Sequence, residues 1–211
     1  MRIGLFGGSF NPIHFGHLRS AEEVREALGL DIVYFVPAAS PPHKEEGGLA
    51  PAEHRLNMVR LATKGNRHFM VSDAEMRRPG RSYTVDTVRH FLATLRDRGA
   101  LYLLMGADAF GDLETWKDCD EIVRLASLAV HTRVGEDGTI TNVALVARRR
   151  FGYTQNDGIL VNPSGQTLSF IPTPAIYISA TLLREKLRQG LSVRYLIPNE
   201  VLDYIARHGI Y

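Results

Sequence analysis

The chain of 211 residues has the length of one domain, with little left over for a second. A hydrophobic fraction of 45% and a charged fraction of 23% indicate a globular protein with a buried core and exclude a disordered chain. The formal net charge of +2 provides no strong field for nucleic acid or a membrane surface, so neither partner is expected.

Two further sequence features bear on the location of the protein. No apolar run approaches the roughly 18 residues that a membrane span requires, and the apolar stretch at the N-terminus is too short for a signal peptide. Cys119 is the one cysteine, which allows no internal disulfide and fits a reducing compartment. We therefore expect a cytoplasmic protein in which Cys119 is a packing residue and not a nucleophile.

Short apolar runs without polar alternation predict five strands that are covered on both faces. These runs lie at 3–6, 32–36, 69–71, 101–105 and 128–130. Between them, apolar residues recur at helical spacing: one stripe over 18–28 stops at Gly29, and a second over 85–95 is followed by Gly99. Alternating strands and helices predict an α/β fold with a doubly wound, mainly parallel sheet.

The segment 135–166 contains the turn signals GEDG, QNDG and NPSG and only weak periodicity. We expect a peripheral helix and loop there, with the arginine run at 148–150 on a solvated helix face or, alternatively, in contact with phosphates. Further on, Ser179 can cap a helix that runs to Gly190, and Pro198 can begin another that ends at Gly209. The expected organisation is a single domain of residues 1–211, with 179–211 as its C-terminal helical part.

The sequence GGSFNPIHFGH, residues 7–17, follows the first strand directly and leads into the first helix. Ligands bind at the carboxyl ends of parallel strands, and glycines such as Gly7 and Gly8 let the backbone approach a ligand closely. The free N–H groups and positive dipole end of the following helix favour phosphate. The turn is neither a P-loop, because no Gly-Lys-Ser/Thr closes it, nor a dinucleotide fingerprint, because G-x-G-x-x-G is missing.

His14 and His17 lie three residues apart on the opening turn of this helix and therefore share one face. They can be phosphate donors, structural residues that cap loop carbonyls, or zinc ligands. A zinc site would need a third protein ligand, which no H-E-x-x-H sequence or cysteine pair supplies. The adjacent glycine turn favours phosphate donors. Because a helix N-terminus disfavours imidazolium, we expect both rings to be neutral until a triphosphate binds.

A strand followed by GGSFNPIHFGH resembles the signature of the nucleotidyltransferases related to class I aminoacyl-tRNA synthetases. The second signature of that superfamily, I-S-[ST]-T-x-[IV]-R, has a counterpart in ISATLLR (178–184), with an alanine and a leucine as departures. Further stretches are similar to the bacterial nicotinate-mononucleotide adenylyltransferases: VPAASPPHK (36–44), RSYTVDT (81–87), MGADAFGDLETW (105–116) and the tail 195–211. The resemblance spans nearly the whole chain, is weakest over 134–166, and implies a Rossmann-like nucleotidyltransferase fold.

The resemblance implies adenylyl transfer from ATP to nicotinate mononucleotide, which gives deamido-NAD and pyrophosphate in NAD biosynthesis. The 5′-phosphate of the mononucleotide would attack the α-phosphorus of ATP, so the site must hold two anions in line and neutralise their charge. Mg²⁺ should accompany ATP and be held by phosphate oxygens and water, so no dedicated protein ligands for a metal are expected.

The resemblance also assigns roles to particular residues. The catalytic residues, which bind phosphate groups and stabilise the leaving pyrophosphate, would be His17, His14, Lys44 and Arg184. The ATP site would comprise Gly7, Gly8, Ser9, Phe10, His14, His17, Gly106, Asp108, Ile178, Ser179 and Arg184. The mononucleotide site would comprise Ser9, Lys44, Tyr83, Thr84, Asp108 and Trp116, with the indole as a platform for the pyridine ring.

From the residues alone, each assignment has a structural alternative. Lys44 and Arg184 can be surface cations, Asp108 a helix cap and Trp116 a core residue. Alternative functions are an adenylyltransferase for nicotinamide mononucleotide or phosphopantetheine, and a non-catalytic nucleotide-binding module on the same fold. The expected partners are ATP and nicotinate mononucleotide. The preference for acid or amide, a homo-oligomeric state and the role of 134–166 stay open.

Overall fold

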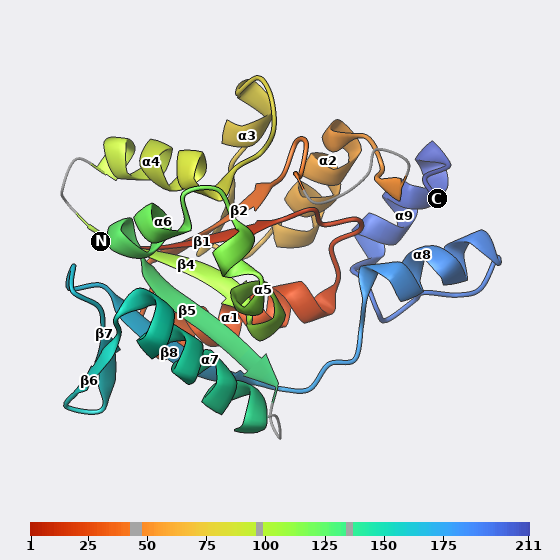
Figure 1. The fold of residues 1–211 in the computed structure, drawn as a ribbon. Helices are drawn as coiled ribbons and strands as arrows, with labels where there is room; N and C mark the ends of the chain where they lie inside the picture. Colours follow the sequence, from red (N-terminus) through yellow and green to blue (C-terminus); the bar gives the residue numbers. More distant parts are fainter. Residues whose placement is uncertain (43–47, 96–98, 134–136) are drawn as a thin grey trace.

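The computed structural model describes residues 1–42, 48–95, 99–133 and 137–211. An eight-stranded sheet with strand order β3-β2-β1-β4-β5-β8-β7-β6 forms its centre (Figure 1). The strands are β1 (Arg2–Gly8), β2 (Ile32–Pro37), β3 (Phe69–Val71), β4 (Ala100–Gly106), β5 (Ser127–Arg133), β6 (Thr154–Asn156), β7 (Ile159–Val161) and β8 (Thr167–Thr173).

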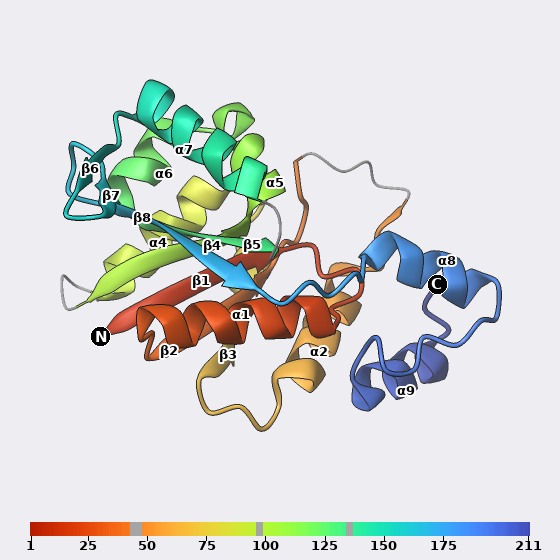
Figure 2. The same ribbon diagram turned by 90° about the horizontal axis from the view of Figure 1, so that it is seen from below.

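Helices cover both faces of this sheet (Figures 1 and 2). They are α1 (Phe15–Leu28), α2 (Ala52–Thr63), α3 (Ala74–Arg77), α4 (Thr84–Leu95), α5 (Ala107–Gly111), the 3-10 turn η2 (Leu113–Thr115), α6 (Cys119–Leu125), α7 (Asp137–Phe151), α8 (Ala180–Arg188) and α9 (Asn199–His208). Helices α4, α6 and α7 lie on one face, and α1 and α2 on the other. Among the residues that the structure describes, no helix is long and apolar enough to cross a membrane.

The predicted doubly wound, mainly parallel sheet is confirmed. All five predicted strands form, as β1 to β5, and they pair in parallel together with β8. In the middle of the sheet β1 lies between β2 and β4, with Phe6 opposite Phe35 on one side and Leu104 on the other. The carboxyl ends of these strands therefore meet at one edge, which is where the turn after β1 lies.

The prediction for 135–166 is correct for a helix and wrong for the loop. Helix α7 forms, but β6 and β7 follow it as an antiparallel hairpin, and β7 pairs antiparallel with β8. The QNDG signal is the hairpin turn: Asp157 and Gly158 both have positive φ, 46° and 81°, as a tight two-residue connection requires. Arg150 pairs with Asp120 on the surface and Arg148 with Gln155, which confirms a solvated face for these two arginines.

Two apolar cores follow from the two covered faces. The first joins the inner sides of α4, α6 and α7 to the sheet, and it includes the buried Cys119, which confirms the prediction of a packing residue. The second joins α1 and α2 to the other face, and Leu183 of α8 and Val201 of α9 belong to it. In Figure 2, α8 and α9 lie beyond the carboxyl ends of the strands. The C-terminal helical part is thereby packed next to the turn after β1.

Predicted helix ends agree with local capping geometry. Gly29 ends α1 in the left-handed conformation at φ 58°, and Gly209 does the same for α9 at φ 57°. At the start of α8, the Ser179 hydroxyl oxygen accepts a hydrogen bond from the backbone N–H of Leu182 at 3.1 Å.

Candidate active site

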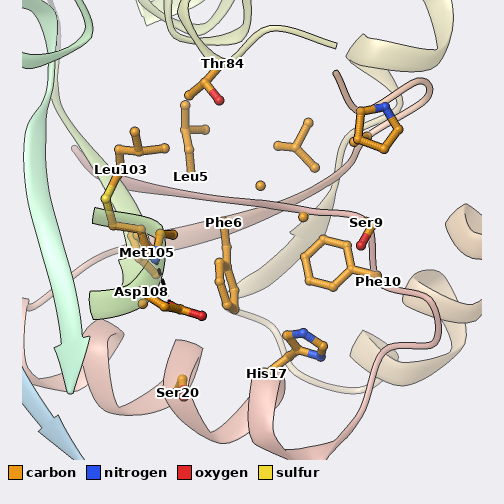
Figure 3. A pocket seen from close by; sticks show the side chains of 18 of the residues that line it. Leu5, Phe6, Ser9, Phe10, His17, Ser20, Thr84, Leu103, Met105 and Asp108 are labelled. Carbon is orange, nitrogen blue, oxygen red and sulfur yellow. Dashed lines mark hydrogen bonds between the residues drawn. The ribbon is translucent and has the colours of Figure 1, made fainter. Parts of the chain in front are cut away.

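A cavity of about 880 Å³ opens at the carboxyl edge of β1 and β4 (Figure 3). Its walls come from the turn after β1, the start of α1, the β4–α5 turn, the start of α4 and the segment before α8. Among the predicted site residues, those that line it are Gly7, Gly8, Ser9, Phe10, His14, His17, Tyr83, Thr84, Gly106, Asp108, Trp116, Ile178 and Ser179. Lys44 lies outside the described residues, and Arg184 does not line the cavity.

The glycine-rich turn is held in an unusual backbone conformation. Phe10 has φ 45°, a left-handed value that is uncommon for a residue with a side chain. Its ring is buried against Phe6 and Phe35 and lies 5.2 Å from the His17 ring, centroid to centroid. The next residue, Asn11, is buried and anchors the turn through its side chain, which donates to the Gly48 carbonyl at 2.8 Å. The turn is therefore fixed before any ligand binds.

His14 forms the N-cap of α1 and is 6% exposed. Burial lowers the pKa of His14 to about 4, so the ring is neutral at physiological pH. It stacks on the ring of His17 with the centroids 3.7 Å apart. The predicted neutral state is confirmed for His14, and burial is its main cause.

His17 has a defined tautomer in this arrangement. The backbone N–H of His14 donates to Nδ1 of His17 at 3.2 Å. A neutral imidazole carries one proton, so the nitrogen that accepts here leaves the proton on Nε2. His17 lines the cavity beside Phe10 (Figure 3).

Arg184 supports the turn instead of lining the cavity. Its guanidinium donates to the backbone carbonyl of Asn11 at 2.9 Å and to the Thr181 hydroxyl at 3.2 Å. Tyr211 reaches the same residue from the C-terminal part, because its hydroxyl donates to Oδ1 of Asn11 at 2.6 Å. Arg184 therefore ties the ISATLLR segment to the glycine turn, and a direct contact with ATP stays a prediction.

Asp108 projects into the cavity from the first turn of α5 (Figure 3). Its Oδ1 accepts the backbone N–H of Ala109 at 2.9 Å, and the N-cap of α5 is Gly106, so Asp108 is not the helix cap. A Cβ atom at Gly106 would collide with Oδ1 of Asp108. A side chain at position 106 would therefore displace the end of the Asp108 side chain.

The cavity wall also carries the aromatic and hydroxyl groups predicted for the mononucleotide. Thr84 begins α4, and the neighbouring Tyr83 ring lies under the Lys117 ammonium, 4.6 Å from the ring centroid. Trp116 is half-buried: it packs against the first core and lines the cavity as well. The two interpretations of this tryptophan, core residue and platform, are therefore compatible.

Sequence reasoning missed five titratable residues that line the cavity: Arg19, Glu75, Asp112, Lys117 and His131. Glu75 is buried, accepts a hydrogen bond from the Thr87 hydroxyl at 2.6 Å, and has its pKa raised by burial. No pattern in the short polar stretch around it indicates a buried site. His131 follows the predicted strand 128–130 directly, so its position at a carboxyl strand end was the available signal.

The described residues contain no group of three or more His, Cys, Asp or Glu side chains placed to hold a metal ion. Asp108 and Asp112 are the aspartates among the cavity-lining residues. This donor set fits a cation that is held mainly by the oxygens of a bound nucleotide and by water.

Comparisons with known proteins agree with this architecture. The family described as cytidylyltransferase-like matches residues 5–186. Two relatives named probable nicotinate-nucleotide adenylyltransferase come from Syntrophotalea carbinolica, 41% identical, and Trichlorobacter lovleyi, 42% identical. These alignments cover 100% of this chain and 97% and 99% of the relatives. Among solved structures, Plasmodium falciparum nicotinic acid mononucleotide adenylyltransferase complexed with NaAD has the same fold, with a TM-score of 0.75 at 17% identity over 100% of this chain and 97% of that chain.

The parallel sheet, the glycine turn with its paired histidines and the ISATLLR segment together define a nucleotidyltransferase. The chain belongs to the cytidylyltransferase-like family and, within it, to the nicotinate-nucleotide adenylyltransferases. The family resemblance drawn from the motifs is thereby confirmed. Nucleotidyltransferases of this kind generally use a divalent metal ion together with ATP.

Proposed function

We propose that this protein transfers the adenylyl group of ATP to nicotinate mononucleotide, releasing pyrophosphate and making deamido-NAD in NAD biosynthesis. The observation that carries the proposal is the meeting of the two motifs: His14 and His17 of the first line the same cavity as Ile178 and Ser179 of the second. The relatives over the full chain length are named for this activity.

The chemical step needs no covalent intermediate with the protein. A 5′-phosphate oxygen of the mononucleotide attacks the α-phosphorus of ATP, and the bond from that phosphorus to the pyrophosphate oxygen breaks. Negative charge grows on the leaving pyrophosphate, and His17 is the proposed hydrogen-bond donor to it. The positive dipole end of α1 also lies at this cavity, which Gly16 and His17 of its first turn line.

Mg²⁺ is the metal ion that we propose to accompany ATP. When bound, it would neutralise phosphate charge and align the triphosphate. Its ligands would be phosphate oxygens and water, with Asp108 or Asp112 near enough to the cavity to contact the hydration shell. In the same proposal Lys44 is a further cation for the phosphates.

The nucleoside parts occupy the two ends of the cavity in this proposal. Asp108 accepts hydrogen bonds from ribose hydroxyls, near Gly106. At the other end the pyridine ring stacks on Trp116, and the nicotinate carboxylate accepts hydrogen bonds from N–H and hydroxyl donors around Thr84, the first residue of α4. An amide would present an N–H₂ group to one of these donors and leave both unpaired, so the acid is preferred.

We further propose that the 211 residues act as one domain, since residues 179–211 share the second core with the sheet. The proposed location is the cytoplasm, and the proposed partners are the two nucleotides, without nucleic acid or membrane. Sedimentation of the purified protein at several concentrations would show whether it forms a homo-oligomer.

One assay tests the function. The purified protein is incubated with ATP and Mg²⁺ and, separately, with nicotinate mononucleotide, nicotinamide mononucleotide or phosphopantetheine. Pyrophosphate release is followed and the adenylylated product is identified by mass. We expect the highest kcat/KM with nicotinate mononucleotide. A higher value with either other acceptor would reassign the substrate, and ATP binding without release in any mixture would leave a non-catalytic nucleotide-binding module.

A further inference from the structure

Arg55 of α2 is a charged side chain that the proposed mechanism does not use. It is 1% exposed and one of the largest fully buried side chains among the described residues. Among the described residues no carboxylate forms an ion pair with it, as its four hydrogen bonds all go to backbone carbonyls. An arginine remains charged even when burial lowers its pKa, as it does here. A buried charge of this kind is costly unless its donors are satisfied.

The four carbonyls belong to three separate segments. Nη1 donates to the Ser9 carbonyl of the glycine turn at 2.8 Å and to the Ala38 carbonyl after β2 at 2.6 Å. Nη2 donates to the Ala39 carbonyl at 3.1 Å, and Nε to the Ala50 carbonyl at 2.9 Å. One planar guanidinium thus joins the turns that follow two neighbouring parallel strands.

A carbonyl that faces Arg55 fixes the direction in which the N–H bond of the next residue points. In a trans peptide unit the C=O and N–H bonds point in opposite directions. The effect is visible after β2, where the N–H groups of Ala39 and Ser40 donate to the Ser82 hydroxyl oxygen at 2.9 and 3.1 Å, on the side away from the guanidinium. Ser82 in turn precedes Tyr83 and Thr84 in the wall of the cavity.

The same reasoning applies to the peptide unit between Ser9 and Phe10. Its carbonyl faces Arg55, so the N–H of Phe10 points away from Arg55. Ser9, Phe10 and His17 line the cavity next to this peptide unit (Figure 3). The positive φ of Phe10 is a strained conformation that persists only when its surroundings hold it. Arg55 holds it from one side, and the packed Phe10 ring holds it from the other.

We infer that Arg55 is a positioning residue for the phosphates, which directs the backbone N–H of Phe10 into the phosphate end of the cavity and sets the turn 38–40 that carries Ser82. This inference rests on the proposed function for the identity of the anion. The guanidinium itself does not touch substrate: it acts through the two turns, and its geometry matters in addition to its charge. Lysine could keep the charge but could not reproduce the planar fork that bonds three segments.

Two variants test the inference against simple destabilisation. Arg55→Lys removes the fork, while Asn162→Ala removes a buried side chain that also bonds backbone groups, at the amino end of β8 and away from the cavity. We expect both variants to melt below wild type, yet only Arg55→Lys to lose kcat, by about tenfold to a hundredfold, the scale of a small misplacement of reacting groups. Wild-type kcat in folded Arg55→Lys, or an equal loss in Asn162→Ala, would overturn the positioning role.

A measurement on the wild-type protein covers the case in which Arg55→Lys does not fold. The chain has nine phenylalanines, so ¹⁵N-phenylalanine labelling gives few amide signals, and Phe10→Leu identifies the one from Phe10. We expect inorganic pyrophosphate to shift the Phe10 amide signal more than those of the other phenylalanines. An unmoved signal at saturating pyrophosphate would overturn the inference. Because no acceptor is present, this result is independent of whether nicotinate mononucleotide is the substrate.

Discussion

The stacked rings of His14 and His17 differ in what surrounds them, although the sequence presents them as a pair. His14 is buried and neutral at the helix cap, and its backbone N–H donates to Nδ1 of His17, which lines the cavity. Both rings line the cavity, and the choice between a structural and a phosphate-binding role for each stays a prediction. His17 stays the proposed donor.

His17→Ala is expected to lower kcat by about a hundredfold or more, because it removes one preorganised donor to the leaving pyrophosphate. Steady-state kinetics with ATP and nicotinate mononucleotide measures the loss, and thermal melting shows whether the fold is kept. A folded variant with wild-type kcat would remove His17 from the mechanism.

Trp116→Ala is expected to raise KM for the mononucleotide and leave KM for ATP nearly unchanged. The loss should be about 1–3 kcal/mol, the scale of an aromatic stack on a base. Because Trp116 also packs against the first core, the melting temperature should fall too. Trp116→Phe provides the control: it keeps a ring and should recover part of the affinity. Nicotinate and nicotinamide mononucleotide should be weakened by similar factors, and loss of only one would argue against stacking.

At the level of elements, the cavity is lined by residues at the ends of strands and the starts of helices. In the β4–α5 turn, the residue type at position 106 is linked to the position of the Asp108 side chain. The carboxylate of Asp108 occupies the space that a Cβ at Gly106 would need. A side chain there would displace the end of the Asp108 side chain. The backbone conformation would stay unchanged, because the φ of −74° at Gly106 suits any residue.

Gly106→Ala is therefore expected to keep the stability of the fold and raise KM for ATP by about tenfold, the cost of misplacing a hydrogen bond to a charged group. Gly111→Ala in the same helix is the matched control, because a Cβ there meets no atom within 4 Å. Steady-state kinetics gives KM for ATP in both variants, and thermal melting gives their stability. Equal KM values for ATP in the two would show that Asp108 does not bind the nucleotide.

The elements that could be predicted from sequence are those whose buried positions carry apolar residues and whose ends carry typical capping residues. Strands β1 to β5 are apolar runs, and the ends of α1, α8 and α9 carry glycine or serine caps. Strand β8 was missed because its sequence TLSFIPT alternates and contains a proline, although it lies beside β5 in the sheet. Helix α2 was missed because Arg55 and Thr63 occupy buried positions, which hides its apolar face.

Residues of the candidate site could be predicted only where they belong to a recognisable sequence motif. The glycine turn and ISATLLR lie far apart in sequence, and it is the fold that brings them to one cavity. Glu75 and Arg55 could not be found in this way, because nothing in a single sequence marks a polar residue as buried beside a ligand, whereas His131 directly follows a predicted strand.

On the scale of the whole molecule, burial of titratable groups connects stability to pH. The folded-state pKa of His14, about 4, lies below the ordinary value of 6.5. Between these values the unfolded chain binds a proton that the folded protein does not, so stability falls as the pH falls. Glu75 acts in the opposite sense, because burial raises its pKa and folding then favours its protonated form.

When the pH is lowered from about 7 to about 5, the free energy of unfolding is expected to fall in the wild-type protein by about 2 kcal/mol more than in the His14→Asn variant. Urea unfolding of both proteins at the two pH values measures this difference. Glu75 is present in both and cancels in the comparison. Parallel losses would mean that folding does not lower the pKa of His14.

The contacts of Asn11 also have a consequence for how the protein is made. Arg184 and Tyr211, which bond this residue, are separated from it by 173 and 200 positions. Translation proceeds at about 5–20 residues per second, so a newly made glycine turn waits on the order of ten seconds or more for these two partners. During that interval the ribosome carries a chain whose first strands and helices can already fold, while the phosphate-binding turn lacks the bonds that hold it in place. Chains released early, before residue 184 is added, are expected to keep much of the sheet and to lack a finished catalytic centre.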